Sequence, residues 1–550
     1  MIIDKLSSGS KFVGGWFRGN AKLLIACFAV GLICHFQMYS QGSTVFDGVA
    51  SLCNDNGYGW YVSGRWDIGL GRWGLLLASW AKQGLCSPVL VSAITLGLFS
   101  IGAVVLVGLL GIKETWLKYV TAFLLICAPF ISGCVVYYYC SNSYALCFMS
   151  SILAVALLGK PGGKCGIGRG AGASLLLMFA LGCYQSSMGV FCVAGLLLLL
   201  ADFLRRNQPK QTLAHFGKLI VVLALGTALY LAVNATALAV TGTSMNDYGG
   251  ASSVDAGNII AQLPSSLALV YTSFAALMFG NGVFGNGFCE PKVMLLFAAV
   301  AFVLLVVVMV KRGKNGAVGS MLAMACIALI PLAANIVLIA DPDYGSPTIP
   351  MVGGFVCSLA LLPVLAQLCC AEGDGMEDGV RSSGVGLLDE SVRKVVYVAS
   401  CVPLVFLAWS YALQCNADSE VMGLERNQVQ SLATRAVDAL ESNAAVQAGA
   451  TVLIAGTPQQ GNYSLTSSFS GTTSDYARYG MICSDFYNNN YRCWRALTME
   501  YAGTKLNLCS IDVASAIVQS AEFRALSNFP SDGCIAEING VVVLKFSEMG

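Results

Sequence analysis

Residues 40–80 read SQGSTVFDGVASLCNDNGYGWYVSGRWDIGLGRWGLLLASW and separate the first strongly apolar run of the chain from the second. The stretch is too polar to cross a bilayer and too apolar for a disordered loop. Among its tryptophans and tyrosines lie three carboxylates and two arginines, namely Asp47, Asp55, Asp67, Arg65 and Arg72. Amphipathic segments with aromatic rings and few charges lie in the membrane interface. We therefore expect residues 40–82 to lie at a membrane surface, where they meet a substrate with a lipid tail and a polar head.

The composition predicts a multi-pass membrane protein. Hydrophobic residues make up 56% of the 550 residues and charged residues only 11%, whereas a soluble chain has about 25% charged residues. Apolar runs of about 20 residues, the length of the hydrocarbon core, recur through the first three-quarters of the chain. The first run, 21–38, lacks a convincing cleavage site and is interpreted as a retained span. The net charge of +1 gives no nucleic-acid signature.

Eleven spans are predicted from the apolar runs. They cover about 21–39, 87–111, 117–136, 144–159, 171–184, 186–204, 219–241, 293–310, 317–340, 351–370 and 395–413. Lysines and arginines in short loops mark the cytoplasmic side, which places the N-terminus inside. Before residue 414, 19 basic residues then fall inside and four outside, the four being Arg65, Arg72, Lys82 and Lys292.

One further apolar run, 263–279, does not fit this alternation. If it crossed the membrane, the basic residues at 311–314 would lie outside. We therefore expect an interfacial or re-entrant helix on the outer side. Irregular backbone at membrane depth is tolerated where it lines a cavity, so this segment is a candidate wall of the site.

From residue 414 the composition becomes that of a soluble domain. We predict a membrane domain over 1–413 and a small α/β domain over 414–550 on the outer side of the membrane. Its expected elements are a helix at 419–442, a strand at 451–455, a helix at 511–526 and a strand at 541–546 after an Asn539-Gly540 turn. Five cysteines of this region are candidates for disulfides, with connectivity open: Cys415, Cys483, Cys493, Cys509 and Cys534.

No metal or cofactor is expected. The chain has 22 cysteines but only two histidines, and no metal-binding spacing stands out. Most cysteines lie inside apolar runs, where they behave as small hydrophobic side chains. His35, near the end of the first span, is interpreted as a packed or interfacial histidine.

The plausible chemistry lies on the outer side, where carboxylates gather: Asp47, Asp55, Asp67, Asp247, Asp255, Glu290, Asp341 and Asp343. A carboxylate in an apolar setting can act as a general base near neutral pH, and an arginine can hold a phosphate with two hydrogen bonds. Transfer from a lipid-phosphate-linked donor needs both roles. The alternatives are a helix cap or solvated loop residue for Asp47, a headgroup anchor for Arg72, and turn residues at Asp341 and Asp343.

The order of several short motifs resembles the bacterial Gtr type II glucosyltransferases over roughly residues 20–260. An aspartate follows the first span, in TVFDGV at 44–49. A Gly-Arg-aromatic motif opens an amphipathic run, in DIGLGRWGLLL at 67–77. The remaining motifs are SYAL at 143–146, LGCYQ at 181–185 and DYG at 247–249. Asn142 departs from the pattern, because an acidic residue was expected in that second outer loop.

The resemblance implies a GT-C-like, all-α polytopic fold that transfers a sugar from a polyprenyl-phosphate donor, typically undecaprenyl-phosphate glucose, to a surface glycan, usually with inversion. Asp47 would then be the base and Asp67 the next candidate. Arg72, with Arg65 nearby, would bind the donor phosphate. The implied pocket residues are Trp73, Tyr144, Tyr184, Gln185, Asp247 and Tyr248.

Two alternatives remain. A transporter or flippase of lipid-linked sugars should show inverted repeats and polar residues at the bilayer midplane, and neither is evident. A signalling or assembly protein would work through residues 414–550, which show no nucleophile triad or nucleotide-binding loop. That region is instead interpreted as an acceptor-recognition domain or lid.

Overall fold

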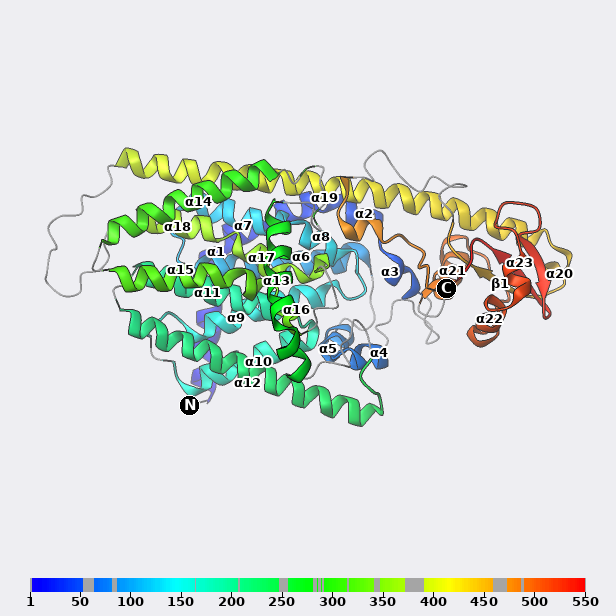
Figure 1. Ribbon diagram of the computed structural model, residues 1–550, viewed down its shortest axis with the longest axis horizontal. Coiled ribbons are helices and arrows are strands. Elements are labelled where there is room, and N and C mark those ends of the chain that lie inside the picture. The colour runs from blue at the N-terminus through cyan, green and yellow to red at the C-terminus, as the bar shows by residue number, and fades with distance from the viewer. Residues whose placement is uncertain are drawn as a thin grey trace.

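The computed structural model describes residues 2–52, 64–81, 87–163, 165–205, 208–246, 256–279, 284, 288, 291–313, 316–340, 347–370, 390–458, 472–485 and 489–549. A bundle of long helices forms one part of the molecule, and a smaller mixed domain lies at the far end of the long helix α19 (Figure 1). The bundle and the mixed domain meet around the short helices that follow the first span.

The helices that correspond to the eleven predicted spans are all present in the described chain. They are α1 (Ile2–Cys34), α6 (Pro88–Leu109), α7 (Thr115–Cys127) with α8 (Pro129–Val135), α9 (Ser141–Leu158), α10 (Ile167–Cys183), α11 (Ser187–Arg205), α12 (Pro209–Thr241), α14 (Pro291–Arg312), α15 (Ala317–Ala334), α17 (Gly353–Ser358) with α18 (Leu361–Cys370), and α19 (Glu390–Glu441). By length and composition, 10 described helices can cross a membrane, or 11 with the bent pair α7 and α8. This set includes α13 (Ala256–Phe279), which was not predicted as a span, and leaves out α10, which is a shorter apolar helix. The all-α polytopic fold is thereby confirmed.

Proline explains the one bent span. The third span is broken by 43° between α7 and α8, where Ala128 is extended and Pro129 opens the second helix. A residue before proline is driven out of the helical region because the proline ring clashes with its backbone.

Helix α13 (Ala256–Phe279) runs crosswise to its neighbours at one end of the bundle (Figure 1). The guanidinium of Arg312, at the end of α14, donates to the carbonyl of Phe203 near the end of α11. The end of α14 therefore lies beside the start of α12. The end of α12 and the start of α14, which α13 connects, consequently lie at the same end of the bundle. This arrangement agrees with the expected interfacial helix. The length and composition of α13 alone would also allow a span.

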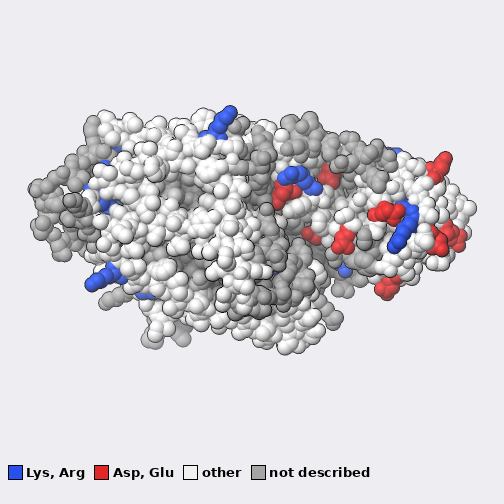
Figure 2. All heavy atoms as spheres, in the orientation of Figure 1, with Lys and Arg blue, Asp and Glu red and all other residues white. Residues whose placement is uncertain are grey.

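The charged side chains are unevenly distributed along the bundle. On the face in Figure 2, described lysines and arginines gather at one end of the bundle. Other charged groups lie toward the opposite end and over the small domain, and the surface between carries a single basic group, at the upper edge of the view. A surface so poor in charge is typical of helices that lie in a hydrocarbon core.

Helix α19 is continuous for 52 residues. The boundary predicted between 413 and 414 falls inside it, and the helix predicted at 419–442 is its second half. The helix therefore links the bundle to the small domain without a loop.

The small domain has a three-stranded sheet in the order β1-β3-β2. Strands β1 (Thr451–Ala455) and β3 (Val541–Lys545) are parallel, and β2 (Ile535–Ile538) is antiparallel to β3. The Asn539-Gly540 turn joins β2 to β3, with positive φ at both residues, as a tight hairpin requires. The other elements are α20 (Ala444–Gln447), η6 (Asp475–Arg478), α21 (Tyr491–Ala496), η8 (Leu497–Tyr501), α22 (Ile511–Val518) and α23 (Ala521–Ala525).

Two details differ from the expectations. The helix predicted at 511–526 is two helices, because the Ser520 side chain accepts a hydrogen bond from Phe523 N and starts α23. The five cysteines proposed for disulfides are all described, and none of them forms one.

Candidate active site

The short helices between α1 and α6 lie where the bundle meets the small domain (Figure 1). They are α2 (Phe36–Gln41), α3 (Phe46–Ala50), α4 (Gly64–Gly69) and α5 (Trp73–Ala81). Helix α3 carries Asp47, α4 carries Asp67, and Arg72 lies in the turn between α4 and α5. The structure thus brings together three of the predicted site residues.

Helix α3 packs against the small domain. Val49 and Ala50 lie in one hydrophobic core with residues of β1, β3 and α21. The amide of Phe46 donates to the carbonyl of Gly480 over 2.8 Å. Asp47 is half-buried, and its Oδ1 accepts a hydrogen bond from Nδ2 of Asn489 over 3.0 Å.

Burial raises the pKa of Asp47 to about 6, and the Asn489 hydrogen bond and the positive charge of Arg72 oppose this rise. A carboxyl group with this pKa is largely ionised at neutral pH yet can still accept a proton. It therefore meets the requirement for a general base.

Helices α4 and α5 pack instead against the bundle. The amide of Arg72 donates to the carbonyl of Asp67 over 2.7 Å, and Gln185 Nε2 donates to the carbonyl of Leu70 over 2.6 Å. Gly71 has a φ of 73°, and a side chain there would collide with the Tyr230 hydroxyl. The Gly-Arg-aromatic motif is thus the tight turn that holds the arginine in place.

Asp67 is buried, and its burial raises its pKa to about 7. The charge of Arg72 lowers this pKa and the charge of Asp47 raises it. Arg72 is therefore close enough to act electrostatically on both carboxylates. Two neighbouring carboxylates resist simultaneous ionisation, so the negative charge of Asp47 adds to the effect of burial on Asp67.

An aromatic wall borders the arginine. The Arg72 guanidinium lies over the Tyr184 ring, 5.0 Å from its centroid, and Tyr184 contacts Tyr144 edge to face at 5.0 Å. Tyr137 contacts Tyr144 in turn at 6.1 Å. Burial raises the pKa of Tyr137 well above its usual value, and Asp47 is close enough to raise it further, so this phenol is neutral.

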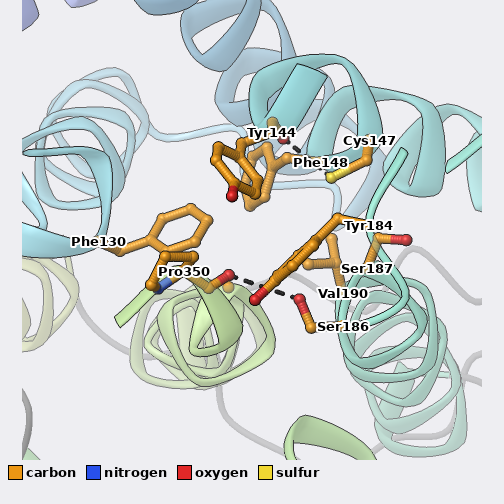
Figure 3. Close-up of a pocket in the computed structure, with 10 residues that line it drawn as sticks. Phe130, Tyr144, Cys147, Phe148, Tyr184, Ser186, Ser187, Val190 and Pro350 are labelled. Atoms are coloured by element: carbon orange, nitrogen blue, oxygen red, sulfur yellow. Dashed lines mark hydrogen bonds between the residues drawn. The ribbon is translucent and has the colours of Figure 1, made fainter. Parts of the chain in front are cut away.

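A small cavity of about 10 Å³, with room for about one water molecule, lies beside Tyr184 (Figure 3). In the view the rings of Phe130, Tyr144 and Tyr184 surround it, and Ser186 donates to the carbonyl of Pro350 at its edge. Most of the lining is apolar.

The other predicted site residues fall into two groups. Trp73 is buried and packs on the backbone at Gly182, so it fixes α5 on α10. Gln185 bonds to Leu70 and also donates to Tyr230 over 3.0 Å. The Arg65 side chain, Asp55, Asp247, Tyr248, Asp255, Glu290, Asp341 and Asp343 lie outside the described residues.

Sequence reasoning missed the contribution of the small domain. Asn489 is 442 positions from Asp47, and no local pattern pairs them. Asp475 and Tyr479 of the same domain also come close enough to act on Tyr137. Only the run of asparagines at 488–490 offered a polar signal in the sequence.

Within the described residues, one group of metal-ligating side chains was found, formed by Cys34, His35 and Cys415. Both ring nitrogens of His35 are already hydrogen-bonded, Nδ1 to Ser132 Oγ over 2.7 Å and Nε2 to the carbonyl of Ile126 over 2.8 Å. This geometry is that of a packed histidine.

Comparison with known proteins gives one family. The family model described as Glucosyl transferase GtrII matches residues 42–359, which is more than half of the 550 residues. Neither the curated proteins nor the solved structures gave a match. The match begins just before α3 and includes Asp47, Asp67, Arg72 and Tyr184. The chain is therefore a member of the GtrII glucosyltransferase family.

Proposed function

We propose that this glucosyltransferase moves glucose from a polyprenyl-phosphate donor to a cell-surface glycan at the outer face of the bacterial cytoplasmic membrane. Membership of the family supports glucosyl transfer, and the many apolar helices support work in a bilayer. The positive-inside rule places the basic loops in the cytoplasm. The candidate site and residues 414–550 lie at the opposite end of the bundle (Figure 1).

The observation that carries the proposal is the gathering of Asp47, Asp67 and Arg72 beside an aromatic wall. Asp47 acts as the general base and removes the proton from the acceptor hydroxyl. That oxygen attacks the anomeric carbon, the bond from this carbon to the phosphate oxygen breaks, and polyprenyl phosphate leaves with the electron pair. Attack opposite the leaving group inverts the anomeric carbon.

Arg72 meets the negative charge of the departing phosphate. A guanidinium offers two parallel hydrogen bonds to phosphate oxygens, and Tyr184 holds the group from one face. The glucosyl ring lies against Tyr144 and Tyr184, because aromatic rings pack well on the apolar face of a sugar. No metal takes part in this scheme.

Asp67 acts as the partner of Asp47. Burial raises the pKa of Asp67 to about 7, so a large share of this carboxyl group is protonated near neutral pH. A protonated Asp67 removes one negative charge from the neighbourhood of an incoming phosphate. If Asp47 does not act as the base, Asp67 is the next candidate.

The donor class is tested with detergent-purified protein. Labelled glucose is supplied as polyprenyl-phosphate glucose or as nucleotide-linked glucose, with surface glycan from cells that lack this chain as the acceptor. We expect label in the glycan only from the lipid-linked donor. Transfer from the nucleotide-linked donor alone would overturn the proposal. Because detergent provides no sealed compartment, any product also excludes transport as the sole activity.

A further inference from the structure

The candidate site is divided between two parts of the molecule. Asp67 and Arg72 are held by the bundle through Gln185 and Tyr184. Asp47 lies on α3, between the bundle and the small domain (Figure 1), and two of its helix neighbours belong to the core of that domain. The position of Asp47 relative to Arg72 therefore depends on how the small domain is docked.

Two acidic side chains on α19 hold the docking segment 472–485. Asp418 is buried and accepts hydrogen bonds from Ser474 N over 2.8 Å and from the Tyr476 hydroxyl over 2.6 Å. About two helical turns further along α19, the Glu425 side chain accepts a hydrogen bond from Met481 N over 3.1 Å. The carbonyl of Gly480, beside that contact, receives the Phe46 amide. A chain of hydrogen bonds thus runs from α19 to the start of α3.

Asn489 completes this arrangement at the carboxylate itself. Its Nδ2 donates to Oδ1 of Asp47 over 3.0 Å. An amide nitrogen can only donate, so the bond orients the carboxylate and favours its ionised form. The second oxygen, Oδ2, is then left to receive the proton of an acceptor hydroxyl.

We propose that Asn489 is a positioning residue for the base Asp47, and that residues 414–550 thereby supply part of the active site. This inference rests on the proposed function, since it needs Asp47 to be the base. It extends that function by giving the small domain a direct part in glucosyl transfer, beyond acceptor recognition.

The test measures glucose transfer from polyprenyl-phosphate glucose across pH with detergent-purified full-length variants. Asn489→Ala removes the donor, and we expect transfer near pH 7 to fall about 10- to 100-fold. The acidic limb of the profile should move to higher pH, because the ionised carboxylate loses a stabilising hydrogen bond. Part of the loss should therefore be recovered in alkaline buffer.

Asn489→Asp is a second variant that is less prone to misfold, because aspartate has nearly the shape of asparagine. It places a negative charge beside Asp47, so the acidic limb should move further than in Asn489→Ala. Asn507→Ala is the matched control. Asn507 is exposed on the same domain, and its side chain donates, among the described residues, to Gly449 O and Thr451 Oγ1, so we expect an unchanged profile.

A uniform loss of activity with an unmoved acidic limb would show a merely structural role for Asn489 and overturn the inference. Wild-type activity in Asn489→Ala would do the same. Asp47→Asn separates the two proposals. If Asp47→Asn is inactive while the Asn489 variants are normal, only the inference fails. If Asp47→Asn is fully active, the assignment of the base fails first.

Discussion

Helix α3 and the turn between α4 and α5 lie in the same stretch after the first span, yet they are held in different ways. Helix α3 shares a core with the sheet of the small domain. The turn at Gly71 is fixed by Gln185 and Tyr230 of the bundle. One region therefore brings Asp47, the proposed base, from the side of the small domain, and the other presents Arg72 from the side of the bundle.

The candidate site therefore lies at the interface between the bundle and the small domain. Neither region holds all the groups that the proposed reaction needs. Helix α3 supplies the carboxylate of Asp47 but no cation, and the turn supplies the cation of Arg72. The charge of Arg72 acts on both carboxylates across the junction. Changes on the two sides should therefore give distinct kinetic signatures.

The largest effect is expected on the side of α3. Asp47→Asn keeps the shape of the side chain but removes the base, so transfer should fall by about 10²- to 10⁴-fold, while binding of polyprenyl-phosphate glucose persists. Asp532→Asn, at an exposed position of the small domain, should behave as wild type. Equal activity of Asp47→Asn and wild type would move the base to the bundle side, with Asp67 next in line.

On the bundle side, Arg72→Lys keeps the charge but loses the planar fork that matches a phosphate. We expect transfer to fall about 10- to 100-fold with weaker donor binding, measured as a rise in the KM for the lipid-linked donor. The control Arg524→Lys lies on the surface of α23. A change in acceptor KM alone would contradict the assignment of Arg72 to the donor phosphate.

The smallest effect concerns the turn itself and is measured on stability. Gly71→Ala forces a side chain against the Tyr230 hydroxyl at a φ of 73°, and we expect a loss of about 2–4 kcal/mol in the free energy of unfolding. Gly503→Ala is matched in φ, 72°, but meets open space, so it should cost only about 1–2 kcal/mol. Thermal unfolding compares the two. Equal losses would show that Tyr230 does not constrain the turn.

The fold could be predicted well from the sequence because hydrocarbon thickness and loop charge act locally. Every predicted span has a helical counterpart, and the alternation of basic loops indicated that α13 connects two helix ends on one side. The continuity of α19 could not be predicted, since a change from apolar to polar composition marks where a helix leaves the membrane and does not mark a break. The bend between α7 and α8 was marked in the sequence by Pro129, but a prediction from hydropathy alone does not consider prolines.

The candidate site was predicted only in part. Asp47, Arg72 and Tyr184 stood out because short motifs carry them, and the structure brings them together. Asn489, Asp418 and Glu425 did not, because their partners lie far away in the sequence and depend on domain docking. Such contacts depend on the tertiary structure, and the spacing of hydrophobic residues along the sequence does not predict them.

The pH dependence of glucose transfer by the purified wild-type protein tests the central claim most directly. Asp47 must be ionised to accept a proton, and burial raises its pKa to about 6. The rate should therefore be low in acid and rise with pH through about 6, as this carboxyl group loses its proton. A rate that stays flat through this range, or that rises only near about 4, where an ordinary exposed aspartate ionises, would contradict a buried Asp47 as the base.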